Sequence, residues 1–405
     1  MENRLIVLLL ISLLFVISCD DGNPLIDNEK LLLDRYGEIR DDTLYAVADT
    51  FIIGGSVVTG FSPKLLIGTY RDFRTRSLLK FTGFPADTMR LDSVRVLLSS
   101  ISTFGEKMAP IEARIYKIQE DWDNNINTSE SWQDYLSKID PAPVKNVTFD
   151  AILQDSADYV FDLPLELVSE WQDTTGGEKN FGVLIDYSSA DHVIEFASRE
   201  NSGTIKRPRI VYVYTDTKHD TTLRDTVLTL RDASLITYSG TFDDRKIFIS
   251  SGYATYAFFK FDFSTLPSNI NITSADFIFT QDSLSSIINR HRTQTVILRN
   301  SITDFSLLPF YELDSTFVTS IYHNVILSEE TANKLSLDNS IKAGIGQSFV
   351  QSMINKSISH GSFYLEYSGK GNDISVYALR GITDAETAAR PQLRLQYYYV
   401  PNGRL

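Results

Sequence analysis

Ala257-Phe258-Phe259-Lys260-Phe261-Asp262-Phe263 is the stretch of sequence that decides the fold of this chain. Side chains alternate across an extended strand, so its last three phenylalanines share one face and Lys260 and Asp262 share the other. A related stretch, Ser77-Leu78-Leu79-Lys80-Phe81, has its lysine 180 positions earlier (260 − 80). Both stretches predict half-buried β-strands.

The two strands belong to a longer series of matching segments. The segments keep their order along the chain, and their spacing stays between 181 (274 − 93) and 183 (390 − 207) positions. So constant a spacing predicts an internal duplication. The matching segments are 93–98 with 274–279, Asp121-Trp122 with Asp304-Phe305, and Arg207-Pro208 with Arg390-Pro391.

The duplication also predicts where the domains begin and end. We expect a signal peptide at 1–19, a tether at 20–42, a first domain at 43–215 and a second at 224–405. The run 215–222 is polar and aperiodic, which predicts a linker at 216–223. We therefore expect two independently folded domains that proteolysis would separate at this linker.

Strand patterns dominate both copies, and helical periodicity is scarce. One helix is predicted in each copy, at Leu165–Gln172 and at 341–354, each followed by a new strand. Many short strands separated by turn residues are typical of β-sandwiches. The predicted fold class is all-β, with two tandem jelly-roll-like antiparallel β-sandwich domains.

The N-terminus carries a targeting signal. Arg4 precedes an apolar run at 5–17, which is too short to span a membrane and is typical of a signal peptide. The following Val16-Ile17-Ser18-Cys19 resembles the lipobox of bacterial lipoproteins and predicts a lipid on Cys19, the sole cysteine. We expect a cell-envelope protein anchored in the membrane by that lipid, at the outer membrane or cell surface rather than the inner membrane.

Charge and motifs restrict the chemistry. A net charge of −14 disfavours nucleic acid as a partner, because nucleic-acid binding needs a basic face. The five histidines are scattered without zinc-binding spacing, and neither a nucleophile elbow nor a phosphate-binding loop occurs. We expect no catalytic residues, no metal site and no cofactor. Structural calcium at the oxygen-rich loop around Trp122 is a minor alternative to a plain turn.

The first copy resembles the DNRLRE family of extracellular β-sandwich domains, relatives of carbohydrate-binding modules. The resemblance rests on 76–81, on Trp122, Trp132 and Trp171, on Phe196-Ala197-Ser198-Arg199-Glu200, and on 207–210. It covers nearly all of 49–214, and the second copy keeps it only in part. There Phe305 replaces the first tryptophan and Gly381 stands at the place of Glu200. The resemblance implies a sandwich fold, with carbohydrate binding as the associated role.

The candidate ligand-binding residues are Trp132 and Tyr135, which stand in a polar stretch and could stack on a sugar ring. The alternative is that Trp132 plugs the edge of the sandwich. Trp122 and Trp171 are predicted in the core, Arg199-Glu200 as a structural ion pair, and the arginines at 71, 74 and 76 as a basic patch or a solvated edge.

The predicted function is that of a non-catalytic cell-envelope lipoprotein with polysaccharide as its candidate ligand and the first copy as the binder. The first alternative is a structural or adhesive spacer lipoprotein that binds protein partners. A divergent polysaccharide-degrading enzyme is a lesser alternative, because two suitably spaced carboxylates would suffice for that chemistry.

Overall fold

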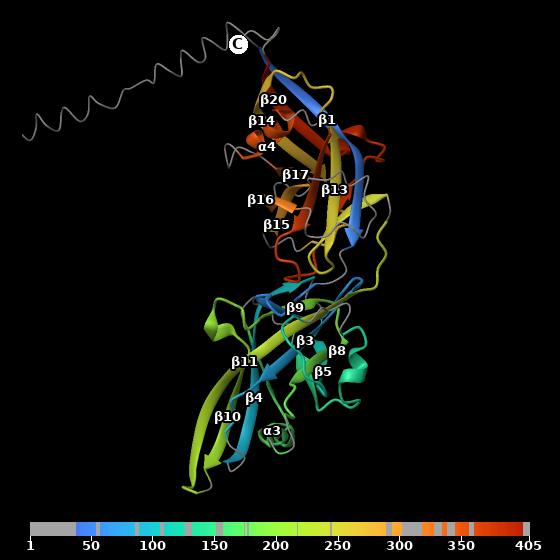
Figure 1. Cartoon of the computed structure of the whole chain (residues 1–405). Helices are drawn as coiled ribbons and strands as arrows, with labels where there is room; N and C mark the ends of the chain where they lie inside the picture. Colours follow the sequence, from blue (N-terminus) through green and yellow to red (C-terminus); the bar gives the residue numbers. More distant parts are fainter. Residues whose placement is uncertain are drawn as a thin grey trace, which may run out of the picture.

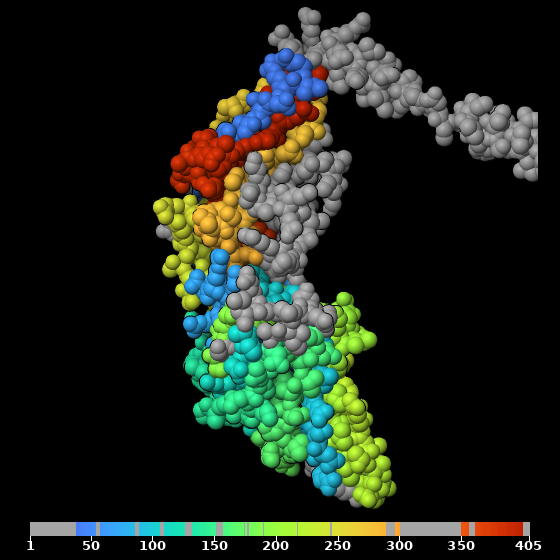
Figure 2. Space-filling model, turned by 180° about the vertical axis from the view of Figure 1, so that it is seen from behind, coloured from blue at the N-terminus to red at the C-terminus, as the bar shows by residue number. Residues whose placement is uncertain are grey.

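The computed structural model describes residues 38–399 except 54–56, 86–88, 106–108, 126–131, 151–156, 174, 176–177, 217, 244, 289–293, 302–317, 328–333, 338–344 and 356–359. Cys19, the signal peptide and Phe305 therefore lie outside the described residues. The chain folds almost wholly into antiparallel β-structure, which confirms the predicted fold class. Two β-sandwiches lie end to end, and the same two lobes are visible from behind (Figures 1 and 2).

The first sandwich, which is the lower one in Figure 1, contains most of the N-terminal half of the chain. Its helix α3 (Leu165–Gln172) has the predicted bounds. Its strands are β2 (Lys64–Tyr70), β3 (Phe73–Phe81), β4 (Met89–Phe104), β5 (Ile111–Lys117), β6 (Lys145–Phe149), β7 (Asp158–Asp162), β8 (Val183–Ser189), β9 (Val193–Ala197), β10 (Arg209–Asp216) and β11 (Thr221–Tyr238).

The second sandwich contains most of the C-terminal half together with the first strand of the chain. Its helix α4 (Ile345–Asn355) lies within a residue of the predicted end. Its strands are β1 (Glu38–Ile53), β12 (Lys246–Ser250), β13 (Thr255–Asp262), β14 (Ile270–Thr280), β15 (Gln294–Ser301), β16 (Val318–Leu327), β17 (Lys334–Leu337), β18 (His360–Tyr367), β19 (Val376–Arg380) and β20 (Gln392–Tyr399).

The two sandwiches have the same strand order. In the first, hydrogen-bonded pairs run β6-β5-β8-β3-β11-β10-β4-β7, with β2 beside β9. In the second they run β16-β15-β18-β13-β1-β20-β14-β17, with β12 beside β19. The Nε of Arg207 donates a hydrogen bond to the Asn201 carbonyl at 2.9 Å. The same bond joins Arg390 to the Asp384 carbonyl, also at 2.9 Å, and both of these residues lie 183 positions after their counterparts. The predicted repeat is thus present as a repeated structure.

Each sandwich takes its central strand from the other copy. Strand β1, which opens the first copy, pairs with β13 and β20 of the second sandwich. Strand β11, which opens the second copy, pairs with β3 and β10 of the first. The predicted domain boundaries were therefore wrong. Asp216 pairs with Thr221, so Asp216 and 221–223 of the predicted linker belong to the β10–β11 hairpin, and β1 begins at Glu38, inside the predicted tether.

The repeat also corrects one detail of the sequence comparison. Strands β9 and β19 correspond with an offset of 183, so Gly381 occupies the position of Ser198 and not that of Glu200. The Arg199–Glu200 ion pair is present at 4.0 Å, with both side chains about two-fifths exposed. An exposed pair at this distance contributes little to stability.

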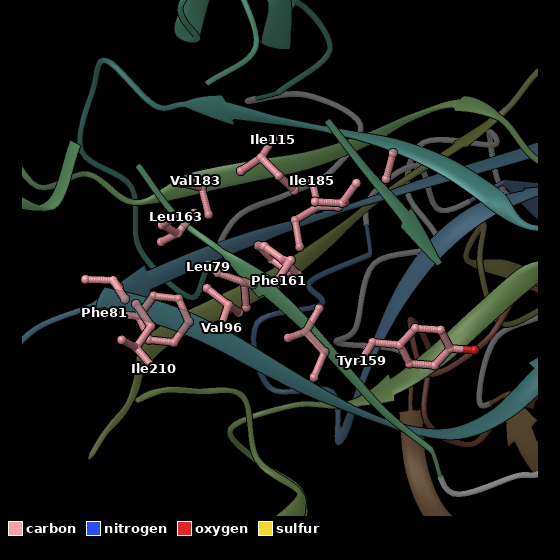
Figure 3. Close-up of a cluster of buried hydrophobic side chains, with 14 of the residues drawn as sticks. Leu79, Phe81, Val96, Ile115, Tyr159, Phe161, Leu163, Val183, Ile185 and Ile210 are labelled. Carbon is pink, nitrogen blue, oxygen red and sulfur yellow. The ribbon is translucent and has the colours of Figure 1, made fainter. Parts of the chain in front are cut away.

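Each sandwich has a core of inward-facing strand side chains. In the first, Phe81, Val96, Ile115 and Ile210 come from four different strands and meet between the sheets (Figure 3). In the second, Phe259, Phe261 and Phe263 point into the core as their alternation predicts. Trp171 is buried in the first core, as predicted.

A separate buried cluster joins the two sandwiches. Phe73 and Ile236 from the first sandwich and Phe248 and Val376 from the second belong to this one cluster, which we call the junction core. Phe51, near the end of β1, packs against Phe248 with ring centroids 5.3 Å apart. Interfaces between domains are usually small and mobile, whereas a continuous apolar core resists relative motion. The expected pair of independent domains is thus wrong, because the junction core and the exchanged strands join them.

Candidate functional site

The predicted binding residue Tyr135 belongs to a polar and aromatic group on the outer face of the first sandwich. Tyr135 begins the short 3₁₀-helix η2 (Tyr135–Lys138), Arg76 lies on β3 and Asp186 on β8. The Arg76 Nε lies 2.6 Å from Asp186 Oδ1, and the Tyr135 hydroxyl donates to Asp186 Oδ2 at 3.3 Å. The guanidinium carbon of Arg76 lies 4.5 Å from the Tyr135 ring centre and 5.5 Å from that of Tyr187. We call these four residues the Arg76 cluster.

The Arg76 cluster carries no net charge at neutral pH. Burial raises the pKa of the Tyr135 phenol, and Asp186 adds to that rise while Arg76 opposes it. Burial likewise raises the pKa of Tyr187. Both phenols therefore stay protonated at neutral pH, and the charge of Arg76 is balanced by Asp186. Such a site disfavours an anionic ligand, because an anion would have to compete with Asp186 for Arg76.

Trp132 does not belong to this surface. Its side chain is only 4% exposed and packs with Trp122, Ile139 and Leu184 in a buried cluster. The proposed role of Trp132 as a stacking platform is wrong, because neither face of its ring is open to a sugar. The alternative, a plug at the edge of the sandwich, agrees with its burial. Trp122 is buried in the same cluster and donates from Nε1 to the Phe181 carbonyl at 2.8 Å.

In the oxygen-rich loop around Trp122, the carboxylate of Asp121 is paired with two cationic side chains of the same chain. Asp121 Oδ1 lies 3.0 Å from Lys80 Nζ and 3.3 Å from Arg231 Nη1. Burial acts to raise the pKa of Asp121, but its hydrogen bonds and these two charges lower it overall. Asp123 accepts the backbone N–H of Asn125 at 2.7 Å, which is a turn contact. Two cations beside the first carboxylate oppose calcium there, and the described residues contain no cluster of three or more potential metal ligands.

The three arginines of the predicted basic patch go to different places. Arg71 reaches the second sandwich and donates from Nη1 to the Ser286 carbonyl at 3.2 Å. Arg74 is exposed on β3, and only Arg76 enters the cluster with Tyr135. The local sequence suggested one patch, but the turn after β2 separates Arg71 from the strand that carries the other two.

Two carboxylates, one buried and one half-buried, were not found from the sequence. Asp232 on β11 accepts the backbone N–H of Arg199 at 2.6 Å, and Asp49 on β1 accepts that of Ile382 at 2.7 Å. Asp49 and Asp232 are 183 positions apart, so each carboxylate fastens an exchanged strand to the equivalent loop of its host sandwich. The repeat offset was the signal that could have found them.

A similar polar group occupies the same face of the second sandwich. Tyr256 occupies the position equivalent to Arg76, and Glu366 occupies the position equivalent to Asp186. Both lie 180 positions after their counterparts. Lys370 Nζ donates to the Tyr256 hydroxyl at 2.8 Å and lies 2.7 Å from Glu366 Oε2. The two faces thus share an arrangement of cation, carboxylate and tyrosine, built from different residues.

Comparisons with known proteins give no family. No family model matches the chain, and no curated protein matches it. A search of solved structures returns the structure of the Macrobrachium rosenbergii nodavirus, at 9% identity over 91% of each chain with a TM-score of 0.13. A superposition of that quality carries no argument about this chain. Within the described part of the chain, no helix is long and apolar enough to cross a membrane.

Proposed function

We propose that this protein is a non-catalytic cell-envelope lipoprotein that acts as a rigid stalk and holds its first sandwich away from the membrane. The observation that carries the proposal is the course of β1. This strand belongs to the second sandwich although it is the first strand of the chain. Its position decides which sandwich lies next to a lipid on Cys19.

The direction of β1 supports this order. Glu38 begins the strand at the end of the second sandwich that lies farthest from the first, and Ile53 ends it near the junction (Figure 1). A strand of 16 residues spans about 50 Å. A lipid on Cys19 would therefore attach to the outer end of the second sandwich, and the β10–β11 hairpin would be the part farthest from the membrane.

The junction supports a stiff connection between the two sandwiches. Tyr238, at the end of β11, stacks on Phe242 with ring centroids 4.9 Å apart, and Phe242 lies 4.8 Å from Phe248. The chain thus passes between the sandwiches twice, once after β1 and once after β11. The second passage carries part of the apolar packing, so a hinge there would expose aromatic surface.

The orientation can be measured on lipidated protein in vesicles. Donor dyes at Asp41→Cys or Thr222→Cys would be compared with an acceptor dye on the lipid headgroups, since Cys19 carrying lipid has no free thiol. We expect strong energy transfer from position 41 and little from position 222. The Cys19→Ala chain, which lacks the lipid, serves as the control. Equal transfer from both positions, or stronger transfer from 222, would reject the stalk.

Polysaccharide binding is the second candidate function, and the Arg76 cluster is the observation that favours it. A half-buried tyrosine beside a compensated ion pair offers a ring for stacking and hydroxyl partners together. Tyr135→Ala should abolish binding in a glycan screen of residues 20–405. The exposed neighbour Leu136→Ala should leave binding unchanged. No binding by the unsubstituted chain would leave the stalk as the sole proposal.

A further inference from the structure

We propose that each sandwich accepts only one of the two exchanged strands, because the side chains of β1 and β11 fit different slots. The slot in the second sandwich, between β13 and β20, is then a binding site for β1 alone. This inference concerns how the chain selects its pairing. It holds whether or not the protein acts as a stalk.

The backbone does not distinguish the two strands. β11 opposes Lys80 with Arg231, and β1 opposes Lys260 with Ala48, both next to an irregularity in the register. Each strand also presents its carboxylate, Asp232 or Asp49, to a backbone N–H of the host. In the unexchanged arrangement, β1 would lie in the first sandwich and β11 in the second. The same backbone hydrogen bonds would form there, because the two strands have equivalent registers. Side chains must therefore decide which strand enters which slot.

The slot of the first sandwich requires a small polar residue at position 234. Ser234 is fully buried, and its hydroxyl accepts the backbone N–H of Leu66 at 3.0 Å. Thr59 Oγ1 bridges the backbone of Ser234, accepting from its N–H at 2.9 Å and donating to its carbonyl at 2.6 Å. The residue of β1 that corresponds to Ser234 is Phe51. A phenyl ring there would collide with this network and leave the buried Leu66 N–H without its partner.

A second position on β11 is equally specific. Arg231 lies beside Asp121 and donates to the Trp122 carbonyl, so it ties β11 to the loop over the buried tryptophans. The corresponding residue of β1 is Ala48, which could make neither contact. In the second sandwich Ala48 packs against Ile52 and Phe258 and stands opposite Lys260, so an arginine there would place a second cation directly across from the first.

The slot of the second sandwich requires a large apolar residue at position 51 of β1. Phe51 fills the junction core between Phe242, at 5.7 Å, and Phe248, at 5.3 Å. A serine at that place would leave a cavity between these rings. The two strands are therefore complementary to their slots, and exchanging them damages both sites at once.

The strand exchange takes place within one chain and not between two copies. Ile53 and Val57 are separated by three residues, and the return passage from Tyr238 packs in the same junction through Phe242. Both passages cross one junction. A second copy could take β1 only if this shared junction opened. The partner of β1 is thus the second sandwich of its own chain.

The pairing can be tested with four double-cysteine variants of residues 20–405, which contain no native cysteine. Thr43 opposes Arg394 and Thr226 opposes Val211 in the exchanged arrangement. The unexchanged arrangement would instead bring Thr43 to Val211 and Thr226 to Arg394. A short thiol cross-linker should join the first two pairs within one chain at least about ten times more efficiently than the other two, given the short reach required. Preferential linkage of the unexchanged pairs, or linkage between chains, would overturn the proposal.

Side-chain fit is tested by swapping the two decisive residues. Phe51→Ser with Ser234→Phe should reduce the Thr43–Arg394 linkage at least about tenfold, because neither strand fits its slot. The control, Phe51→Leu with Ser234→Thr, keeps an apolar residue at position 51 and a hydroxyl at position 234, and it should retain the linkage. If the swapped chain links Thr43 to Arg394 as well as the control does, fit does not select the strand and the inference fails.

Discussion

The buried carboxylate of Asp232 should contribute stability that is lost as the pH rises from about 4 to 7. Burial is the main cause that raises the pKa of Asp232 from its ordinary value near 3.8 to about 7. The nearby Glu200 adds to the rise, while the Arg199 N–H and the charges of Arg199 and Arg207 oppose it. The perturbation we suggest is Asp232→Asn, which keeps an oxygen that can accept from Arg199 but cannot ionise.

The sign follows from comparing the folded and unfolded states. In the unfolded chain Asp232 loses its proton near pH 4, whereas in the folded chain it keeps the proton until about pH 7. The folded state therefore binds more protons between these values, and the free energy of unfolding decreases as pH rises. A difference of about 3 pH units at about 1.36 kcal/mol each corresponds to about 4 kcal/mol.

The assay is urea unfolding of residues 20–405 with and without Asp232→Asn, at pH 4.5, 6 and 8. All other titrating groups are shared, so the difference between the two chains isolates Asp232. The stability of the variant relative to the natural chain should increase with pH and level off above about pH 8. Asp49→Asn should act in the same direction, because burial also raises the pKa of Asp49. A difference that stays constant with pH, or falls, would refute the reasoning.

Three further predictions follow from the burial and pairing of particular residues. Trp132→Ala should cost about 3–5 kcal/mol in urea unfolding, since its ring is buried, whereas an exposed platform would cost little. Cleavage in the hairpin end between Asp216 and Thr221 should give two fragments that elute together until denaturant is added, because β10 and β11 stay paired; separate elution would contradict the exchange. Cys19→Ala should abolish labelling with palmitate and release the protein from membranes, and unchanged labelling would reject lipid attachment.

The strands were predictable because their alternation is local. Phe259, Phe261 and Phe263 needed no partner to show which face would be buried, and α3 was found from its helical pattern. The offset between the copies likewise predicted that the same unit occurs twice. These features depend on spacing along the chain, which a sequence displays directly.

The exchange of β1 and β11 could not be predicted in this way. Both strands satisfy the same backbone pairing, and the choice depends on whether position 234 can hold a phenyl ring beside Leu66 and Thr59. Those neighbours come together only in the fold. The polar run 215–222 has the composition of a linker, yet its ends belong to two strands that pair.

The candidate site was predictable only in part. Tyr135 is half-buried against the cluster that holds Trp132, and composition could not distinguish a tryptophan that stacks on ligand from one that closes a core. Arg76 entered the site through its pairing with Asp186, a residue 110 positions away in sequence. Contacts over such distances are set by strand order, which the local sequence does not contain.

The stiffness of the junction is the central claim, and a distance measurement between the two sandwiches tests it most directly. Spin labels at Arg95→Cys on β4 and Arg394→Cys on β20 report across the junction, and labels at Arg95→Cys and Glu112→Cys report within the first sandwich. If the junction core and the two chain passages hold the sandwiches together, the distance distribution across the junction has one peak, no broader than that within the sandwich. A broad or multiple distribution across the junction, beside a narrow one within the sandwich, would contradict the rigid stalk.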